Sequence, residues 1–510
     1  MRRDIRRGLI PGMMLKDALG DMEAGGDVPG TLSIGGIAVD SRKVRPGDLF
    51  VARGGGRADG HDHLGQAARA GAAAAVVERR LPDPPLPLIV VASTTEALPR
   101  IAARFHGDPS ARLAVVGVTG TNGKTTVTYI LESILAAAGR TAAVIGTINY
   151  RVAGEVLRAG LTTPFPHELQ EFLATALARG ATHVAMEVSS HSADQGRIAG
   201  VRFDAGIFTN LSHDHLDYHR DMEAYFFAKA RLFREFLPAG GKTAGMAFNA
   251  DDPYGARLAR EFPSALTFGF SRDAAVRPLR VEMGAEGTLM DLRTPRGDLP
   301  LRTKLIGAYN ASNVMAAVCG AVLLGIPGEA IREGVERLAM IPGRVEFIPN
   351  DRGVRVCVDY AHTPDGLDCL LSALREIAAG RLITVFGCGG NRDRAKRPEM
   401  GRIAARRSDV VVVTSDNLRH EEPGAIIADI VPGLGAEGLL EAREPASWDS
   451  GYFTVIPDRR AAIARALEIA RPGDTVAIAG KGHENVQIIG DRSVPFEDAG
   501  VVRELLARRR

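Results

Sequence analysis

The stretch Val115-Val116-Gly117-Val118-Thr119-Gly120-Thr121-Asn122-Gly123-Lys124-Thr125-Thr126 decides the fold of the middle of this chain. A β-branched apolar run enters a glycine-rich turn, and a helix-forming segment follows at 127–138. Such a turn points backbone N–H groups at phosphate oxygens, and the N-terminus of the helix adds positive potential. Lys124 is placed to reach the β- and γ-phosphates, and a Thr hydroxyl to hold Mg²⁺. The stretch therefore predicts a nucleoside triphosphate site.

The glycine spacing of this loop departs from the general phosphate-binding loop. The general pattern would place a glycine at position 118, where this chain has Val. The glycines stand instead at positions 117, 120 and 123. This shorter form narrows the possible families.

Bulk properties indicate an ordinary globular enzyme-sized chain. A length of 510 residues predicts two to four domains, and 45% hydrophobic with 24% charged residues is typical of soluble proteins. The net charge of +2 favours neither nucleic acid nor an anionic membrane as a partner. No apolar run reaches about 18 residues, so no membrane insertion is expected.

The cysteines and the start of the chain favour a cytoplasmic protein. Cys319, Cys357, Cys369 and Cys388 show no C-x-x-C pairing, which fits reduced thiols better than a disulfide framework. The basic start is too short and too interrupted for a secretory signal. Met13 or Met14 could be the real start, which would make residues 1–12 dispensable.

Three blocks of the chain predict three α/β domains. Residues 1–111 hold short apolar strands and a helix near 63–70. Residues 112–343 alternate strand, phosphate loop and helix, which predicts a P-loop-type ATPase domain with a parallel sheet and right-handed crossovers. Residues 344–510 repeat the alternation and predict a Rossmann-like, doubly wound domain. The expected strands are 34–39, 49–51, 74–77 and 88–91, then 113–118, 142–145, 183–187 and 205–209, then 354–359, 382–386, 410–414 and 475–479.

Two polar segments of the middle block could carry chemistry. The apolar strand 183–187 delivers Glu187 at its carboxyl end, where ligands of open α/β sheets bind and where an oxygen ligand could hold Mg²⁺. A solvated strand end is the plain alternative. Three His and two Asp fall within 209–219, but no Cys is near and the spacing matches no structural zinc pattern. A single His as a Mg²⁺ ligand or charge neighbour is therefore favoured.

Lys229 lies on an amphipathic helix expected over 225–233. A lysine in such a helix ordinarily belongs to a solvated face. Only a family resemblance gives it another role.

The order of motifs along the chain resembles the Mur ligases, ATP-dependent amino-acid-adding enzymes of peptidoglycan precursor synthesis, and within them the MurE type. The resemblance covers nearly the whole chain after residue 12. Its motifs are Asp40-Ser41-Arg42 with 46–52, the loop 120–126, Thr162-Thr163-Pro164, 187–191 with Gln195 and Arg197, 214–219, 307–313, 342–344 and 359–362.

The resemblance implies a two-step reaction. ATP phosphorylates the γ-carboxylate of D-Glu in UDP-N-acetylmuramoyl-L-Ala-D-Glu, and an incoming amine attacks the acyl phosphate to give an amide, ADP and phosphate. A carboxylate is a poor electrophile until a good leaving group is attached. Lys124 and Mg²⁺ would neutralise the charge that develops on the transferring phosphoryl group.

The resemblance also implies roles for individual residues. The catalytic set would be Lys124, Glu187, His215 and Lys229, with Lys229 N-carbamoylated (N6-carboxylysine) and thus able to hold Mg²⁺ together with Thr125, Glu187 and His215. ATP would contact Gly120, Thr121, Asn122, Gly123, Lys124, Thr125, Thr126, Asn310, Arg344 and Asp359. The UDP-sugar and its peptide would contact Ser41, Thr162, Thr163, Ser189, Gln195 and Arg197.

The third block indicates which amino acid is added. Asp416-Asn417-Leu418-Arg419 resembles the D-N-P-R loop of enzymes adding meso-diaminopimelate, where an Arg suits the distal carboxylate. Arg392 resembles a second carboxylate clamp, and Gly480 and Glu484 of Gly-Lys-Gly-His-Glu match the residues that meet the distal amine. Leu418 replaces the family's Pro, and residues 54–58 depart from the usual uridine-side segment.

Other functions remain as alternatives. The same scaffold could add L-Lys or another diamino acid, or polyglutamylate folate. A P-loop regulator or motor would need the strict loop spacing and a guanine-reading element such as N-K-x-D, which the chain lacks. Retention of Lys124, Glu187, His215 and Lys229 argues against a silent binding module. We expect a monomer that acts on small molecules.

Overall fold

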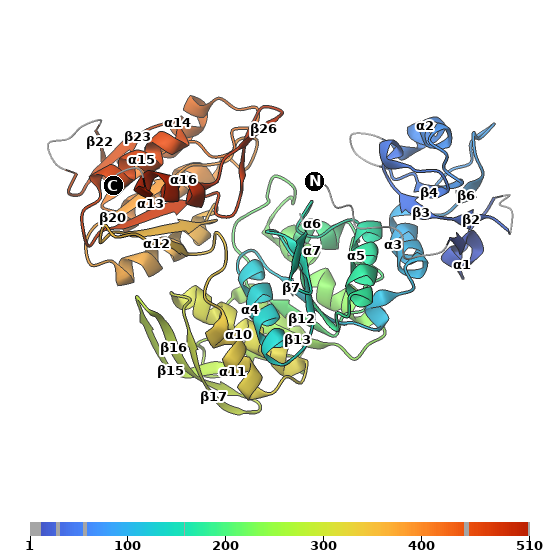
Figure 1. The fold of residues 1–510 in the computed structure, drawn as a ribbon, viewed down its shortest axis with the longest axis horizontal. Coiled ribbons are helices and arrows are strands. Elements are labelled where there is room, and N and C mark those ends of the chain that lie inside the picture. Colours follow the sequence, from blue (N-terminus) through green and yellow to red (C-terminus); the bar gives the residue numbers. More distant parts are fainter. Residues whose placement is uncertain (1–11, 27–30, 55–58, 158, 443–447, 508–510) are drawn as a thin grey trace. The chain divides into compact units, whose positions relative to one another are not determined.

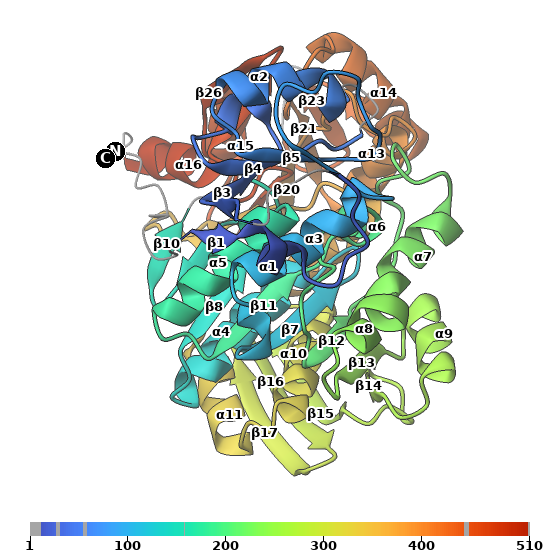
Figure 2. The same cartoon turned by 90° about the vertical axis from the view of Figure 1, so that its right-hand side faces the viewer.

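The computed structural model describes residues 12–26, 31–54, 59–157, 159–442 and 448–507 (Figures 1 and 2). The chain divides into two compact units. The first unit comprises Met1–Thr119, Gly139–Ile207 and Phe227–Met246, and the second comprises Gly120–Ala138, Phe208–Phe226 and Ala247–Arg510. Residues 1–11 and the unusual segment 55–58 lie outside the described residues, so the expectations for them are not addressed.

The N-terminal part forms a small parallel sheet with helices on both faces. Its strands β3 (Gly36–Ala38), β4 (Asp48–Val51), β5 (Ala74–Val77) and β6 (Leu88–Val90) pair in that order. Alternate residues face opposite sides, because Leu49 and Val51 belong to one hydrophobic cluster and Phe50 to another. The helices are α1 (Leu15–Leu19), α2 (Leu64–Arg69) and α3 (Thr94–Phe105), and a short pair β1 (Met13–Met14) with β2 (Ser33–Ile34) precedes the sheet. The predicted helix and the strands expected at 49–51, 74–77 and 88–91 are confirmed, whereas the strand expected at 34–39 is divided at Gly35 into β2 and β3, which belong to different sheets.

The middle of the chain builds an eight-stranded sheet in the order β10-β9-β8-β11-β7-β12-β13-β14. The four predicted strands are present and neighbour one another in it. β7 pairs with β11, and β11 with β8, all in parallel. The bounds are β7 (Ala114–Thr119), β8 (Ala142–Ile145), β9 (Tyr150–Val152), β10 (Glu155–Leu157), β11 (His183–Glu187), β12 (Ala205–Phe208), β13 (Gly245–Asn249) and β14 (Leu266–Phe268).

The helices of this part include the two that the sequence predicted. The phosphate-loop helix is α4 (Lys124–Ala137), and the helix of Lys229 is α7 (Met222–Arg231), which continues into a π-helix at Leu232–Phe236. The other helices are α5 (Pro166–Ala178), α6 (Ser190–Asp194), α8 (Leu237–Ala239), α9 (Pro253–Glu261), α10 (Ala308–Leu323) and α11 (Gly328–Arg337).

A three-stranded antiparallel sheet is not among the predicted elements. It comprises β15 (Arg277–Gly284), β16 (Gly287–Thr294) and β17 (Gly297–Thr303), joined by two-residue turns. Buried and more exposed positions alternate along β16 and β17, as expected for a sheet with one face against α11.

The C-terminal part is a doubly wound domain, as predicted. Its seven strands run in the order β18-β19-β24-β20-β21-β23-β22, and β19, β24, β20, β21 and β23 are mutually parallel. The bounds are β18 (Glu346–Ile348), β19 (Arg355–Asp359), β20 (Leu382–Phe386), β21 (Val410–Val413), β22 (Leu440–Glu441), β23 (Tyr452–Val455) and β24 (Thr475–Ala479), followed by the hairpin β25 (Val486–Ile489) and β26 (Arg492–Pro495).

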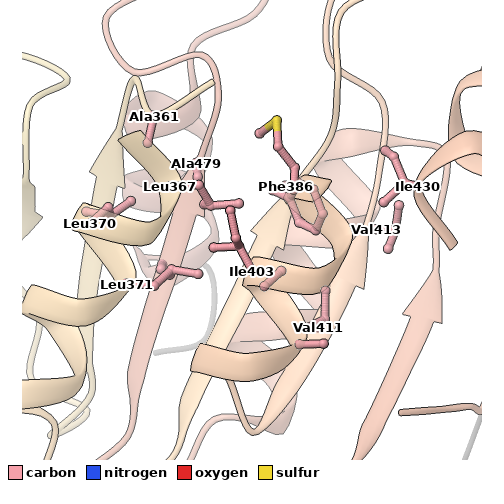
Figure 3. Close-up of a cluster of buried hydrophobic side chains, with 14 of the residues drawn as sticks. Ala361, Leu367, Leu370, Leu371, Phe386, Ile403, Val411, Val413, Ile430 and Ala479 are labelled. Atoms are coloured by element: carbon pink, nitrogen blue, oxygen red, sulfur yellow. The ribbon is translucent and has the colours of Figure 1, made fainter. Parts of the chain in front are cut away.

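Alternate residues of these strands feed two separate cores. One core packs Phe386, Val411 and Val413 against helices α12 (Pro364–Ile377), α13 (Lys396–Arg407) and α14 (Pro423–Ala436), as Figure 3 shows. The other packs Val385 and Val412 against α15 (Arg459–Ile469) and α16 (Asp498–Ala507). Both faces of the strands are apolar, which explains their continuous Val and Ile runs.

No helix in the described ranges has the length and apolar character needed to cross a membrane. All four cysteines are free thiols.

Removal of side-chain volume from the core of Figure 3 tests this packing. Leu371 is fully buried there, so Leu371→Ala should lower the free energy of unfolding by about 2–5 kcal/mol, because it leaves a cavity. Leu440→Ala, at a side chain 64% exposed, should change it by less than about 0.5 kcal/mol. Urea unfolding followed by circular dichroism measures both, and equal effects would contradict the described core.

Candidate active site

Two glycines of the phosphate loop are required by their surroundings. Gly120 has φ +145°, and a Cβ there would lie 1.9 Å from Thr209 Oγ1. Gly123 has φ +88°, and a Cβ there would lie 2.2 Å from Asn313 Oδ1. Both positions therefore exclude side chains. Since α4 begins at Lys124, the loop ends on the N-terminal turn of a 14-residue helix, a place suited to an anion.

The segment after β12 holds the loop in shape. The N–H groups of Thr121 and Asn122 donate to the backbone oxygen and to Oδ1 of Asn210, both at 2.9 Å. Thr209 Oγ1 donates to Asn122 O at 2.6 Å. These contacts preorganise the loop, and a direct contact of Thr121 or Asn122 with nucleotide stays a prediction.

The loop carries cationic side chains. Lys124 Nζ donates to the backbone oxygens of Gly120 and Thr121 at 2.9 and 2.8 Å, so its ammonium lies over the loop. Arg344 Nη2 lies 3.3 Å from Thr125 Oγ1, and its guanidinium stacks 4.6 Å from the Tyr360 ring centroid. The structure thus brings Arg344 to the phosphate loop, and its contact with ATP stays a prediction.

Asn310 and Asp359 shape the same neighbourhood. Asn313 Nδ2 donates to Asn310 Oδ1 at 3.2 Å, and Asp359 accepts the N–H groups of Val345 and Ala361, both at 2.7 Å. Burial raises the pKa of Asp359. Asn313 was absent from the predicted site residues, although it lies three positions after Asn310 and hence on the same face of a helix.

Glu187 is a buried carboxylate at the carboxyl end of β11, opposite Val118 of β7. Its Oε1 and Oε2 accept hydrogen bonds from the backbone N and the Oγ1 of Thr147, both at 2.9 Å. A Cβ at Gly146 would lie 2.4 Å from Oε1, so the backbone at Gly146 passes close to the carboxylate of Glu187. Burial excludes the solvated strand end. A hard carboxylate oxygen held in this way is the donor type that Mg²⁺ prefers.

Five of the six residues predicted to hold the UDP-sugar peptide, all except Ser41, form one network next to Glu187. Thr163 Oγ1 donates to Glu187 O at 2.8 Å and accepts from Ser189 N at 3.2 Å. Arg197 donates to Gln195 Oε1 through Nε at 2.9 Å and to Thr163 O at 3.2 Å. Thr162 Oγ1 lies 3.1 Å from Thr147 Oγ1.

A cavity of about 930 Å³ opens in the first unit. Its lining includes the basic side chains of Arg42, Lys43 and Arg45, the apolar Leu161 and Phe165, and the acidic Asp40, Glu168 and Glu171. The arginine of the network, Arg197, stacks on Phe165 at 4.5 Å. Ser41, the predicted contact at this end, donates to Gln66 Oε1 at 2.9 Å. A cavity of this volume with a basic side suits an elongated anionic ligand.

The predicted metal ligands are divided between the two units. Glu187 and Lys229 belong to the first unit, and Thr125 and His215 to the second. Lys229 is buried rather than on a solvated face. His215 has φ +55°, and its Nε2 lies 3.4 Å from Asp214 Oδ2. Within the described residues, no group of three or more His, Cys, Asp or Glu is arranged to hold a metal.

A second candidate site lies where β20, β21 and β24 end. Asn417 Nδ2 and Lys481 Nζ both donate to Glu484 Oε2 at 2.8 Å, and Lys481 also donates to Asn417 Oδ1 at 3.2 Å. Gly480 has φ +117°, and a Cβ there would lie 2.7 Å from Asp416 Oδ2. The loop after β21 and the loop after β24 thus form one platform, and its buried cation Lys481 was absent from the predicted site residues.

Two arginines lie at this platform. Arg419 has φ +50°, and its Nη1 donates to Gly390 O at 2.8 Å. Burial and, secondly, the charge of Arg392 lower the pKa of Arg419, so the two guanidiniums share one region. Arg392 is half exposed, 3.9 Å from Asp217. Neighbouring guanidiniums of this kind suit carboxylates.

Leu418 explains how the loop tolerates the loss of the family's proline. Its side chain is 9% exposed and belongs to the hydrophobic core on the α12–α14 side of the sheet. Its backbone oxygen accepts from Glu421 N at 3.1 Å. Packing therefore holds the loop where a pyrrolidine ring would have restricted φ.

The fold and these sites define a nucleotide-binding α/β protein with a separate platform for a small charged ligand. Three family models match: the Mur ligase family catalytic domain at 33–106, the Mur ligase middle domain at 118–321 and the Mur ligase glutamate ligase domain at 343–482. The chain belongs to the Mur ligase family, which confirms the resemblance and the three-domain α/β architecture.

Individual relatives narrow the resemblance to the predicted type. The UDP-N-acetylmuramoyl-L-alanyl-D-glutamate–2,6-diaminopimelate ligase of Geobacter metallireducens is 47% identical over 95% of this chain and 97% of its own. A solved structure of a ligase with this name is 30% identical, with a TM-score of 0.68 over 98% of this chain and 99% of that one. The MurF ligase of Thermotoga maritima, solved in complex with ADP, shares the fold at 19% identity, with a TM-score of 0.62 over 93% and 98% of the chains.

The pH dependence of stability tests the burial of His483. Its ring lies tilted against that of Tyr360, with centroids 5.0 Å apart, and burial followed by the charge of Arg344 lowers its pKa from 6.5 to about 3. The folded state binds the proton less tightly than the unfolded state, so stability falls as pH falls from about 6.5 to about 3, by up to about 1.4 kcal/mol per pH unit. Urea unfolding across this window should show a shallower fall for His483→Gln than for the wild type.

The matched control is His420→Gln, whose side chain is 63% exposed. It should keep the wild-type pH dependence. If the free energy of unfolding of His483→Gln falls with pH as steeply as that of the wild type, His483 is not held neutral in the folded state.

Proposed function

We propose that this chain is an ATP-dependent ligase that adds meso-2,6-diaminopimelate to the D-Glu γ-carboxylate of UDP-N-acetylmuramoyl-L-Ala-D-Glu, through an acyl phosphate, in peptidoglycan precursor synthesis. The observation that carries the proposal is the platform where Arg419 and Arg392 lie with Glu484, in a chain 47% identical to a ligase of this name. The reaction would support cell wall biogenesis, and through it cell shape and division.

The first step uses the phosphate loop. The γ-carboxylate attacks the γ-phosphorus of ATP, the bond to the bridging oxygen breaks, and ADP leaves. Lys124, at the N-terminus of α4, would hold the phosphates, and Arg344 beside Thr125 would add positive charge. Asn310 and Asp359 would contact the ribose or the base of ATP.

The metal would be held by oxygen and nitrogen atoms of four side chains. Thr125, Glu187, His215 and the carbamate of Lys229 are the residues proposed for Mg²⁺. Bound Mg²⁺ supplies charge neutralisation on the phosphoryl oxygens. The place of Glu187 supports its assignment, because it is buried at the carboxyl end of β11, where ligands of open α/β sheets bind.

The UDP-sugar peptide would occupy the cavity of the first unit. The side chains of Arg42, Lys43 and Arg45 offer positive charge for a diphosphate. Thr162, Thr163, Ser189, Gln195 and Arg197 would then position the peptide beside Glu187, because these five side chains form one hydrogen-bonded network there.

The second step uses the C-terminal platform. The free amine attacks the acyl carbon, phosphate leaves, and the amine loses a proton to give the amide. Arg419 and Arg392 would bind the distal carboxylate and Glu484 the distal amine, with Asp416, Asn417 and Gly480 shaping the loop. A diamine without a second carboxylate, such as L-Lys, would leave the arginines unpaired, which disfavours it.

The proposal extends to the organisation of the protein. We assign the UDP-substrate, ATP and amino-acid domains to residues 1–111, 112–343 and 344–510, as the sequence predicted. We infer a monomer that works in the cytoplasm on these small molecules.

Phosphate release tests the function. Purified protein with ATP, Mg²⁺ and UDP-N-acetylmuramoyl-L-Ala-D-Glu should release phosphate with meso-diaminopimelate, and mass spectrometry should detect the tripeptide product. L-Lys, L-ornithine and no amino acid are the parallel arms, and they should stay at background. Release with L-Lys alone would overturn the roles of Arg419 and Arg392. No phosphate release with any of these amino acids would point to folate polyglutamylation or another reaction of this scaffold.

The carbamate on Lys229 has its own test. Lys229→Ala and Lys229→Arg should each lower kcat by at least about a hundredfold. Neither variant can form the carbamate, so the anion proposed to hold Mg²⁺ at the transferring phosphoryl group is lost. Removal of dissolved CO₂ should lower the wild-type rate and bicarbonate should restore it, while Lys229→Arg stays inactive. Lys242→Arg, at a lysine that pairs with Asp204 at 2.6 Å, is the control and should keep the wild-type rate. Full activity in either Lys229 variant would remove the carbamate from the mechanism.

A further inference from the structure

A fully buried arginine lies beneath the amino-acid platform. Arg459, the first residue of α15, and Asp498, the first residue of α16, are both inaccessible to solvent. Arg459 Nε and Nη2 donate to the two carboxylate oxygens of Asp498, each at 2.7 Å. This is the planar two-bond geometry in which a guanidinium and a carboxylate fix each other most firmly.

The remaining donors of Arg459 reach two backbone oxygens. Nη1 donates to Ser415 O at 3.3 Å, and Nη2 donates to Ala479 O at 3.0 Å. Ser415 directly precedes the Asp416–Arg419 loop, and Ala479 directly precedes the Gly480–Glu484 loop. A single side chain therefore binds the chain at the start of both loops.

The sheet does not make this connection itself. β21 and β24 are separated by β20, so no backbone ladder joins the strand ends from which the two loops leave. The backbone joins the two segments only further along, where Arg419 N donates to Ile488 O at 3.0 Å. Within the loops, Asn417 bonds to Glu484. At the residues that precede the loops, Arg459 connects Ser415 O with Ala479 O. Residues so far inside the protein cannot touch a substrate.

We infer that Arg459, fixed by Asp498, is a positioning residue for the amino-acid substrate. It sets the separation between the loop that carries Arg419 and the loop that carries Glu484, and hence between the groups for the distal carboxylate and the distal amine. The inference rests on the proposed function.

The chemistry of the guanidinium makes the role testable. Lysine keeps the charge but offers one compact ammonium, which cannot hold both carboxylate oxygens and both backbone oxygens in this planar arrangement. Arg459→Lys should therefore let the loops shift while an ion pair with Asp498 remains. Asp498→Asn is the milder change, because it keeps the shape and one acceptor oxygen.

A second buried ion pair in the same domain provides the control. Arg381 and Asp474 lie at the opposite, amino ends of β20 and β24, where Arg381 Nη2 donates to Asp474 Oδ2 at 2.6 Å. Their side chains are 13% and 5% exposed. Asp474→Asn should destabilise the same domain without disturbing the loops at the carboxyl ends.

The experiment measures kcat and KM for each substrate, together with thermal unfolding, in the full chain. For Arg459→Lys and Asp498→Asn, KM for meso-diaminopimelate should rise roughly tenfold to a hundredfold, because small misplacements of binding groups carry such costs. KM for the UDP-substrate should change by less than about twofold, since the residues proposed for that ligand belong to the first unit. KM for ATP should rise less than KM for meso-diaminopimelate, because only one proposed ATP residue, Asp359, accepts a hydrogen bond from the shifted loop, from Gly480 N at 3.1 Å. The preference for meso-diaminopimelate over L-Lys in kcat/KM should fall.

Each outcome separates this inference from the proposed function. No wild-type phosphate release with meso-diaminopimelate would overturn the function itself. Wild-type activity with an unchanged KM for meso-diaminopimelate in Asp498→Asn and Arg459→Lys would overturn the positioning role. Equal rises in all three KM values, or the same shift in Asp474→Asn, would show a merely structural role. If Arg459→Lys does not fold, Asp498→Asn decides.

Discussion

The constraint on which this protein depends is that parallel strands end together. In a parallel sheet all carboxyl ends lie at one edge, so the loops that leave them are neighbours however far apart they lie in the chain. The phosphate loop follows β7, Glu187 ends β11, and the Arg392, Arg419 and Glu484 loops follow β20, β21 and β24. Apolar strands buried on both faces hold these loop origins fixed.

Buried polar groups then give the loops their shape. Thr147 holds Glu187, Asp359 holds the turn after Arg344, and Arg459 holds two loop origins at once. A buried charge that loses its partner is strongly destabilising. The hydrogen bonds of these groups therefore stay formed, and they hold the bonded atoms in place. The binding residues are thereby preorganised, and a ligand need not spend binding free energy on ordering them.

Much of this arrangement is readable in the chain. Continuous β-branched runs predicted four strands in each of the two larger sheets, and the glycines at 120 and 123 predicted a phosphate-binding turn. The structure adds that Thr209 and Asn313 leave no room for a side chain at either glycine. The three-stranded sheet β15–β17 was missed, because its strands are half exposed and rich in Arg, Glu and Asp. Thr147 and Arg459 were missed as site residues, because their partners lie far away in sequence. Asn313 and Lys481 lie inside motifs that the sequence analysis identified and bond to residues three positions away, but no role was predicted for them.

The amino-acid sequence determined the local chemistry: which segments are strands, where a phosphate loop stands, and which loops carry arginines and carboxylates. It did so because hydrophobic period, glycine spacing and motif order are local properties of the chain. The tertiary structure alone decided that Lys229 and Glu187 are buried, that Leu418 anchors its loop in the core, and that Arg459 joins two loops across β20. These facts depend on contacts between residues distant in sequence, which form only when the sheets assemble.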